Sequence, residues 1–260
     1  MPGSEEKAGA EAPVMEQRKR GWLPFVLLAA GFALFVAFLV LQRSSPGSVE
    51  ARLTARPELA TTLAAFRETY PNDYRAWLAA LSEITDRRGA EAADLAATER
   101  LRAFIASKVE AIASAPVADL DALADANLAS LLRLREAGAA LCAAFVRNGA
   151  QGERLPPAAL ATIGQANALQ FRAARHGEGP QRIARAQLSE ADGGLWYLAI
   201  RQLDPALAGR INSDSAGQGS AEERCATGIT LYRAAAALPA ERAANVTAHL
   251  VRQSFARRGS

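Results

Sequence analysis

Two cysteines are the residues of this sequence whose possible chemistry is easiest to define. Cys142 and Cys225 are the only cysteines among the 260 residues, and each falls on the apolar face of a predicted helix. As small apolar side chains, both would also suit a hydrophobic core without any bond between them. In an oxidising compartment, however, an isolated pair favours a disulfide. Such a bond would close a loop of about 80 residues, which stabilises a fold by roughly 4 kcal/mol in the chain-entropy model.

Metal binding and catalysis find little support in the sequence. His176 and His249 are far apart and have no cysteine or carboxylate at ligand spacing, whereas a metal site needs three or four convergent ligands. The sequence also lacks a Gly-x-Ser-x-Gly elbow and a phosphate-binding glycine loop. We therefore expect no metal, no cofactor and no catalytic residue. The best-placed pair of acids for a glycosidase is Glu68 and Asp73, although acids at helix ends are usually solvated charges.

Two aromatic groups could belong to an interaction surface. Tyr74 and Trp77 follow a predicted helix break, and Trp196 and Tyr197 follow the glycine pair that ends at Gly194. Tryptophan and tyrosine are enriched at binding hot spots. They are equally common in cores, and core packing is the alternative for all four residues.

Basic residues offer a further possible surface. A stripe toward anionic lipid or polymer could be formed by Arg172, Arg175, Arg182 and Arg185. Arginine is abundant throughout this chain, so an ordinary solvated face is the alternative. The formal net charge is only +3, and a nucleic-acid-binding protein would need basic residues gathered on one face. We therefore expect no nucleic-acid partner.

The stretch from Trp22 to Leu41 predicts a membrane anchor. These twenty residues carry no charge, and as a helix they would span about 30 Å, the thickness of a bilayer's hydrocarbon core. The run is longer than the apolar part of a signal peptide, and no Ala-x-Ala cleavage site follows it. The expected organisation is a disordered cytoplasmic tail at 1–21, a transmembrane helix at 22–41 in contact with the lipid bilayer, a linker at 42–48 and a helical domain at 49–258.

The orientation of the anchor follows from its flanking charges. Arg18, Lys19 and Arg20 adjoin the first end of the apolar stretch, and Arg43 alone adjoins the second. Positive residues favour the cytoplasmic side. We therefore expect a cytoplasmic N-terminus and a periplasmic domain, in the inner membrane of a Gram-negative bacterium.

The domain after the linker is predicted to be all-α. Apolar residues recur at spacings of three and four, and no alternating strand pattern appears. The expected fold is a compact antiparallel bundle of about seven helices. Ser220 and Glu223 match a capping box, and Ser189 with Asp192 resembles one. Predicted helices cover 58–70, 74–87, 91–114, 119–147 with a bend near 125–127 or near Gly138, 157–175, 181–203 with an interruption near Ser189, 220–238 and a last segment to about 256.

These patterns favour a binding role over catalysis. The first expectation is a membrane-anchored scaffold or interaction domain that binds another envelope protein. The alternatives are a cell-wall enzyme with helix-end carboxylates and a ligand-binding sensory domain. A sensor needs an output across the membrane, for which the predicted tail of about twenty residues is short, so we rank this third hypothesis lowest.

Overall fold

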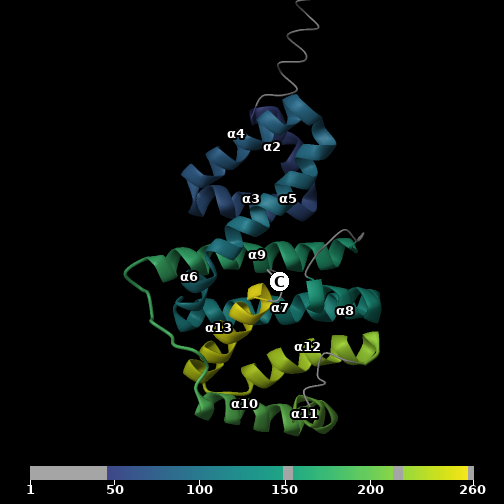
Figure 1. The fold of residues 1–260 in the computed structure, drawn as a ribbon, viewed down its shortest axis with the longest axis vertical. Coiled ribbons are helices and arrows are strands. Elements are labelled where there is room, and N and C mark those ends of the chain that lie inside the picture. Colours follow the sequence, from purple (N-terminus) through teal and green to yellow (C-terminus); the bar gives the residue numbers. More distant parts are fainter. Residues whose placement is uncertain (1–45, 149–154, 213–218, 257–260) are drawn as a thin grey trace, which may run out of the picture.

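The computed structural model describes residues 46–148, 155–212 and 219–256, and this part of the chain is all-helical. The predicted tail and anchor at 1–41 lie outside the described residues. None of the described helices has the length and hydropathy needed to cross a bilayer. The helices, numbered as in Figure 1, are α2 (Pro46–Thr54), α3 (Pro57–Thr69), α4 (Pro71–Arg88), α5 (Ala90–Ser107), α6 (Val109–Ala113), α7 (Val117–Ala137), α8 (Ala139–Asn148), α9 (Pro157–Glu178), α10 (Glu190–Leu203), α11 (Pro205–Asn212), α12 (Ala221–Ala236) and α13 (Ala240–Ala256).

Proline, glycine and serine set many of the helix boundaries. Helices α3, α4 and α9 each begin with proline, whose missing N–H would have no helical partner in the first turn. Gly89 ends α4 with a φ of +87°, a conformation that glycine adopts without steric cost. The capping box at Ser220 is confirmed, since both of its reciprocal hydrogen bonds are present. At Ser189 only the serine side chain caps the helix, by accepting from the Asp192 N–H.

Several predicted boundaries were wrong. The helix predicted at 91–114 is divided at Lys108. The helix predicted at 119–147 is divided at Gly138, where φ is +151°, and this is one of the two places where a bend was expected. The predicted linker is shorter than expected, because residues 46–48 already belong to α2. As a result, the described residues form twelve helices where about seven were predicted.

Residues 181–189 are extended, although a helix was predicted across most of this segment. Pro180 precedes this segment. The backbone groups of the segment bond to residues of distant helices instead of to one another. The Ile183 N–H donates to the Ser114 carbonyl at 2.8 Å. Arg252 of α13 donates to the carbonyls of Arg185 and Ala186. We call residues 181–189 the strap, because it connects α9 with α10 across the ends of α6 and α13.

The helices form an elongated body (Figure 1). Three groups of buried side chains lie within it. The largest group joins α2–α7, α9 and α13, and aromatic rings fill its centre. The second surrounds the two cysteines between α7, α8, α9 and α12. The third lies between α10, α11 and α12, at the end of the body farthest from α2.

Helix α9 is the central packing element. It makes its most extensive contacts with α3, α6 and α7. Near its start Ile163 faces the second group, and in its last turns Phe171 faces the aromatic rings of the first. Where α9 crosses α6, Gly177 lies so close that a Cβ added to it would stand 1.8 Å from the Ala111 carbonyl oxygen. The absence of a side chain at this glycine therefore sets the distance between the two helices.

Replacing Gly177 with alanine should force α9 away from α6, because the obstacle is backbone and cannot rotate aside. We expect Gly177→Ala to lower the free energy of unfolding by about 1–3 kcal/mol or more. Gly194 in α10 is a matched control, since nothing lies within 4 Å of a Cβ added there. Gly194→Ala should raise stability by about 0.5–1 kcal/mol through helix propensity. Urea unfolding of both variants measures the difference, and equal effects would contradict the close approach.

Candidate functional site

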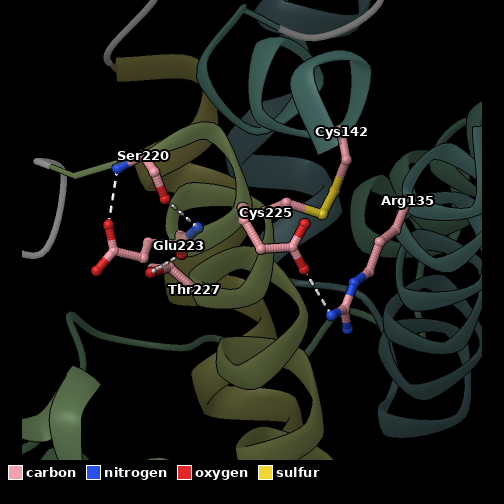
Figure 2. Close-up of a disulfide and its surroundings, with 7 residues drawn as sticks. Arg135, Cys142, Ser220, Glu223, Cys225 and Thr227 are labelled. Carbon is pink, nitrogen blue, oxygen red and sulfur yellow. Dashed lines mark hydrogen bonds and ion pairs between the residues drawn. A yellow bond between two sulfur atoms is a disulfide. The ribbon is translucent and has the colours of Figure 1, made fainter. Parts of the chain in front are cut away.

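The two cysteines meet as the sequence predicts. Cys142 of α8 and Cys225 of α12 have their sulfur atoms 2.00 Å apart and their Cα atoms 5.2 Å apart. Both side chains are fully buried among apolar neighbours that include Leu131, Leu134 and Ile229. Figure 2 shows the bond crossing between the two helices. It ties α12 to the first half of the domain across a separation of 83 residues.

Polar contacts at the start of α12 support the same junction. The Ser220 N–H donates to the Glu223 carboxylate at 2.7 Å, and the Ser220 hydroxyl accepts from the Glu223 N–H at 3.2 Å (Figure 2). The bond from the Ser220 backbone lowers the pKa of Glu223. Arg135 of α7 pairs with Glu222 at 2.6 Å. The first turn of α12 is thus fixed by its own cap and by α7 before the chain reaches Cys225.

Removing the disulfide should destabilise the domain without changing its fold. We expect Cys142→Ala/Cys225→Ala to lower the free energy of unfolding by about 2–4 kcal/mol, because the unfolded chain regains the entropy of a long open loop. Urea unfolding with and without reductant measures this change. Reductant should weaken the unmodified chain and leave the double variant unaffected. A chain that is insensitive to reductant would show that the bond adds nothing to stability.

Tyr74 and Trp77 lie in the aromatic centre of the core. Their exposed fractions are 2% and 7%, so they do not form an interaction surface and the alternative assignment to the core holds. Phe66 packs edge-on against both rings, at centroid distances of 5.5 and 6.0 Å. The Tyr74 hydroxyl donates to Glu50 at 2.8 Å. Burial and this bond to a carboxylate raise the pKa of Tyr74, which keeps the phenol a neutral donor.

Trp196 also faces inward, toward the third buried group. Its indole N–H donates to the Leu231 carbonyl at 3.1 Å, and Tyr197 packs partly against the same group. The neighbouring leucines point outward instead, with 39% of Leu195 and 41% of Leu198 exposed. The region around Gly194 therefore does present an apolar surface, but leucines rather than the predicted aromatic residues form it.

The four arginines do not form one stripe. Arg172 pairs with Asp119 at 3.1 Å. Arg185 points from the strap to the carbonyl oxygens of Ala113 and Ala115. Only Arg175 and Arg182 of the four are exposed without such a contact among the described residues. Two of the predicted anion-contacting residues thus serve to hold helices together.

The histidines and the candidate acids do not come together in one site. His176 Nδ1 lies 2.6 Å from a carboxylate oxygen of Asp119, within hydrogen-bond distance. Glu68 and Asp73 are both exposed at the turn between α3 and α4. Neither lines an open hollow of about 390 Å³ that is formed by Gly47, Glu50, Ala51, Thr54 and Arg67.

No group of three or more potential metal ligands occurs within the described ranges. Sequence reasoning missed Asp119 because nothing in its local pattern distinguishes it from other helix-start acids. Its importance comes from α9, which brings Arg172 and His176 to the same carboxylate.

His249 lies at the contact between α13 and α10. Its ring meets Trp196 edge-on at a centroid distance of 6.2 Å, and its Nδ1 atom is buried without a hydrogen-bond partner among the described residues. Burial, together with the positive charge of Arg252, lowers the pKa of His249. The folded domain therefore favours the neutral ring.

Acid should weaken the domain through His249. Its pKa is lower in the folded than in the unfolded chain, where it is about 6.5, so the unfolded chain binds the proton more readily. The stability due to the neutral ring is complete above pH 6.5 and is lost as the pH falls below that value. We expect urea unfolding of the unmodified chain to weaken more between pH 7.5 and pH 5 than that of His249→Gln. Carboxylates titrate equally in both chains, so parallel losses would contradict the assignment.

Comparisons of the chain with protein-family models, curated proteins and solved structures find no match. The function therefore has to be argued from the residues described above.

Proposed function

We propose that this chain is a single-pass membrane protein whose helical domain binds another protein outside the cytoplasm. The anchor in this proposal is the uncharged stretch at 22–41, which has the length and composition of a transmembrane helix. The three basic residues at 18–20 favour the cytoplasm for the N-terminal side. The bond between Cys142 and Cys225 is consistent with an oxidising compartment such as the periplasm.

The exposed apolar surface of α10 carries the binding part of the proposal. Leu195 and Leu198 are large apolar side chains on one face of a helix, and about two-fifths of each remains exposed. Isolated exposed leucines are ordinary, whereas a contiguous apolar face is typical of an interaction site. By contrast, two polar clusters are engaged in internal contacts. Asp119 holds α9 to α7, and Asp192 accepts from Arg242 and Asn245 of α13.

One experiment tests location and binding together. A photo-crosslinking amino acid replaces Leu195 in the full chain, and intact cells are irradiated before their membranes are washed with alkaline carbonate. We expect crosslinked species that remain in the washed membranes and are digested when protease is added to spheroplasts. This result would follow from an anchored domain that faces outward and binds through α10.

The matched control places the same photoreactive group at Leu95 of α5, which is 65% exposed. Crosslinks at position 195 that are absent at position 95 support a specific surface. Equal crosslinking at both positions would contradict binding through α10. A chain that washes off the membrane, or that protease reaches only after cell lysis, would contradict the anchored and outward-facing arrangement.

A further inference from the structure

One side of α10 has no partner helix. Its buried side packs on α11, α12 and α13, and its opposite side is open to solvent. The exposed residues recur at spacings of three and four along the helix, so they share one face. We call this surface the α10 face; it consists of Ala191, Gly194, Leu195, Leu198 and Gln202.

Further apolar residues are exposed where α10 meets α11. Leu203, at the last position of α10, is 53% exposed. Pro205 and Ala206 at the start of α11 are exposed as well. The junction of α10 and α11 lies at the end of the body farthest from α2 (Figure 1). Leu203 is not part of the α10 face, because it lies about 140° around the helix from Leu198.

Opposite charges stand at the two ends of the α10 face. Glu190 is in the first turn and Arg201 is in the last, and both are exposed. Glu190, Gly194, Tyr197 and Arg201 are separated by four, three and four residues, so they lie in one row along the helix. Neither charge has an ion-pair partner in the part of the chain that the structure describes. This row runs along one edge of the apolar face.

We propose that the α10 face binds the same face of a second copy of this chain, with the two α10 helices antiparallel. A two-fold axis midway between Leu195 and Leu198 places Leu195 of each copy opposite Leu198 of the other copy. The same axis brings the same edge of both helices together. Glu190 of one copy then lies within two residues, about 3 Å along the axis, of Arg201 of the other. The pairing thus joins opposite charges twice, and it also places the helix dipoles antiparallel.

The composition of the face suits a helix as its occupant. Ala191 and Gly194 have little or no side chain, so a second helix can approach closely between the leucines. The surface is nonetheless small, since a stable complex usually buries about 800 Å² on each partner. We therefore expect weak association, with a Kd of the order of micromolar or above. This inference rests on the proposed function, in that it takes α10 to be the surface through which the domain acts.

A leucine substitution tests whether the face is an interface. Energy transfer between labelled copies of the full chain in detergent micelles measures association. We expect Leu198→Lys to weaken it at least about tenfold, because a charge would enter the centre of the apolar contact. Leu95→Lys is the matched control, as it makes the same change at an exposed leucine of α5, and it should leave association unchanged. Circular dichroism checks that both variants remain folded.

Charge reversal tests the antiparallel pairing itself. Glu190→Arg alone and Arg201→Glu alone each place like charges opposite one another in the homodimer, so each variant should associate several-fold more weakly. An equimolar mixture of the two variants should associate again, because every pair in the mixed dimer is then of opposite sign. The double variant E190R/R201E should behave like the unmodified chain. A parallel pairing would already place like charges together in the unmodified chain, so in that arrangement the single reversals would not weaken association and the mixture would associate more tightly than the unmodified chain.

The outcomes separate this inference from the proposed function. Loss of association with Leu198→Lys and recovery in the mixture support pairing of two copies. A full chain that stays monomeric, or equal effects of Leu198→Lys and Leu95→Lys, would overturn it. If position 195 still crosslinks to a different protein in cells while the chain is monomeric, the proposed function stands and the homodimer is wrong. Absence of both signals contradicts both.

Discussion

The contact of α9 with α3 and α6 is the packing constraint on which the arrangement of the body depends. Phe171 stacks on Phe66 with centroids 5.0 Å apart and an interplanar angle of 6°, and both rings are almost fully buried. Six residues further along α9, Gly177 meets the backbone of Ala111. The large ring of Phe171 and the absence of a side chain at Gly177 together determine the distance between α9 and the helices that it crosses, α3 and α6. The positions of α7 and the strap follow from that crossing.

The strap and α13 together determine where α10 lies. Arg252 of α13 holds the strap by donating to two of its carbonyls and also pairs with Glu110 of α6. Asp192 at the start of α10 then bonds to Arg242 and Asn245, again on α13. With its N-terminal turn held by α13 and its inner side packed on α12, α10 keeps its leucine-bearing side open. The candidate surface is therefore a product of long-range contacts.

Local sequence signals predict some of this structure, and long-range contacts decide the rest. The helical class, the starts at proline, the cap at Ser220 and the meeting of Cys142 with Cys225 could all be anticipated, because each depends on local pattern or on simple chemistry. The strap could not, since its extended form is fixed by Arg252, which is distant in sequence. The direction of Trp196 was equally hidden: a helix with apolar residues at 195, 196, 198 and 200 does not reveal which of them faces the core. The membrane anchor stays a prediction.

The place of α13 in the first core has a consequence for synthesis of the chain. Ala244, Ala248 and Val251 are buried in the same group as Val49 and Leu53 of α2. The core to which α2 contributes is therefore complete only when α13 has packed against α6 and α7. A product that stops after α12 would leave that apolar group uncovered and, like other incompletely packed chains, would be open to chaperones and proteases. The packing of this core thus depends on residues from nearly the whole length of the described chain.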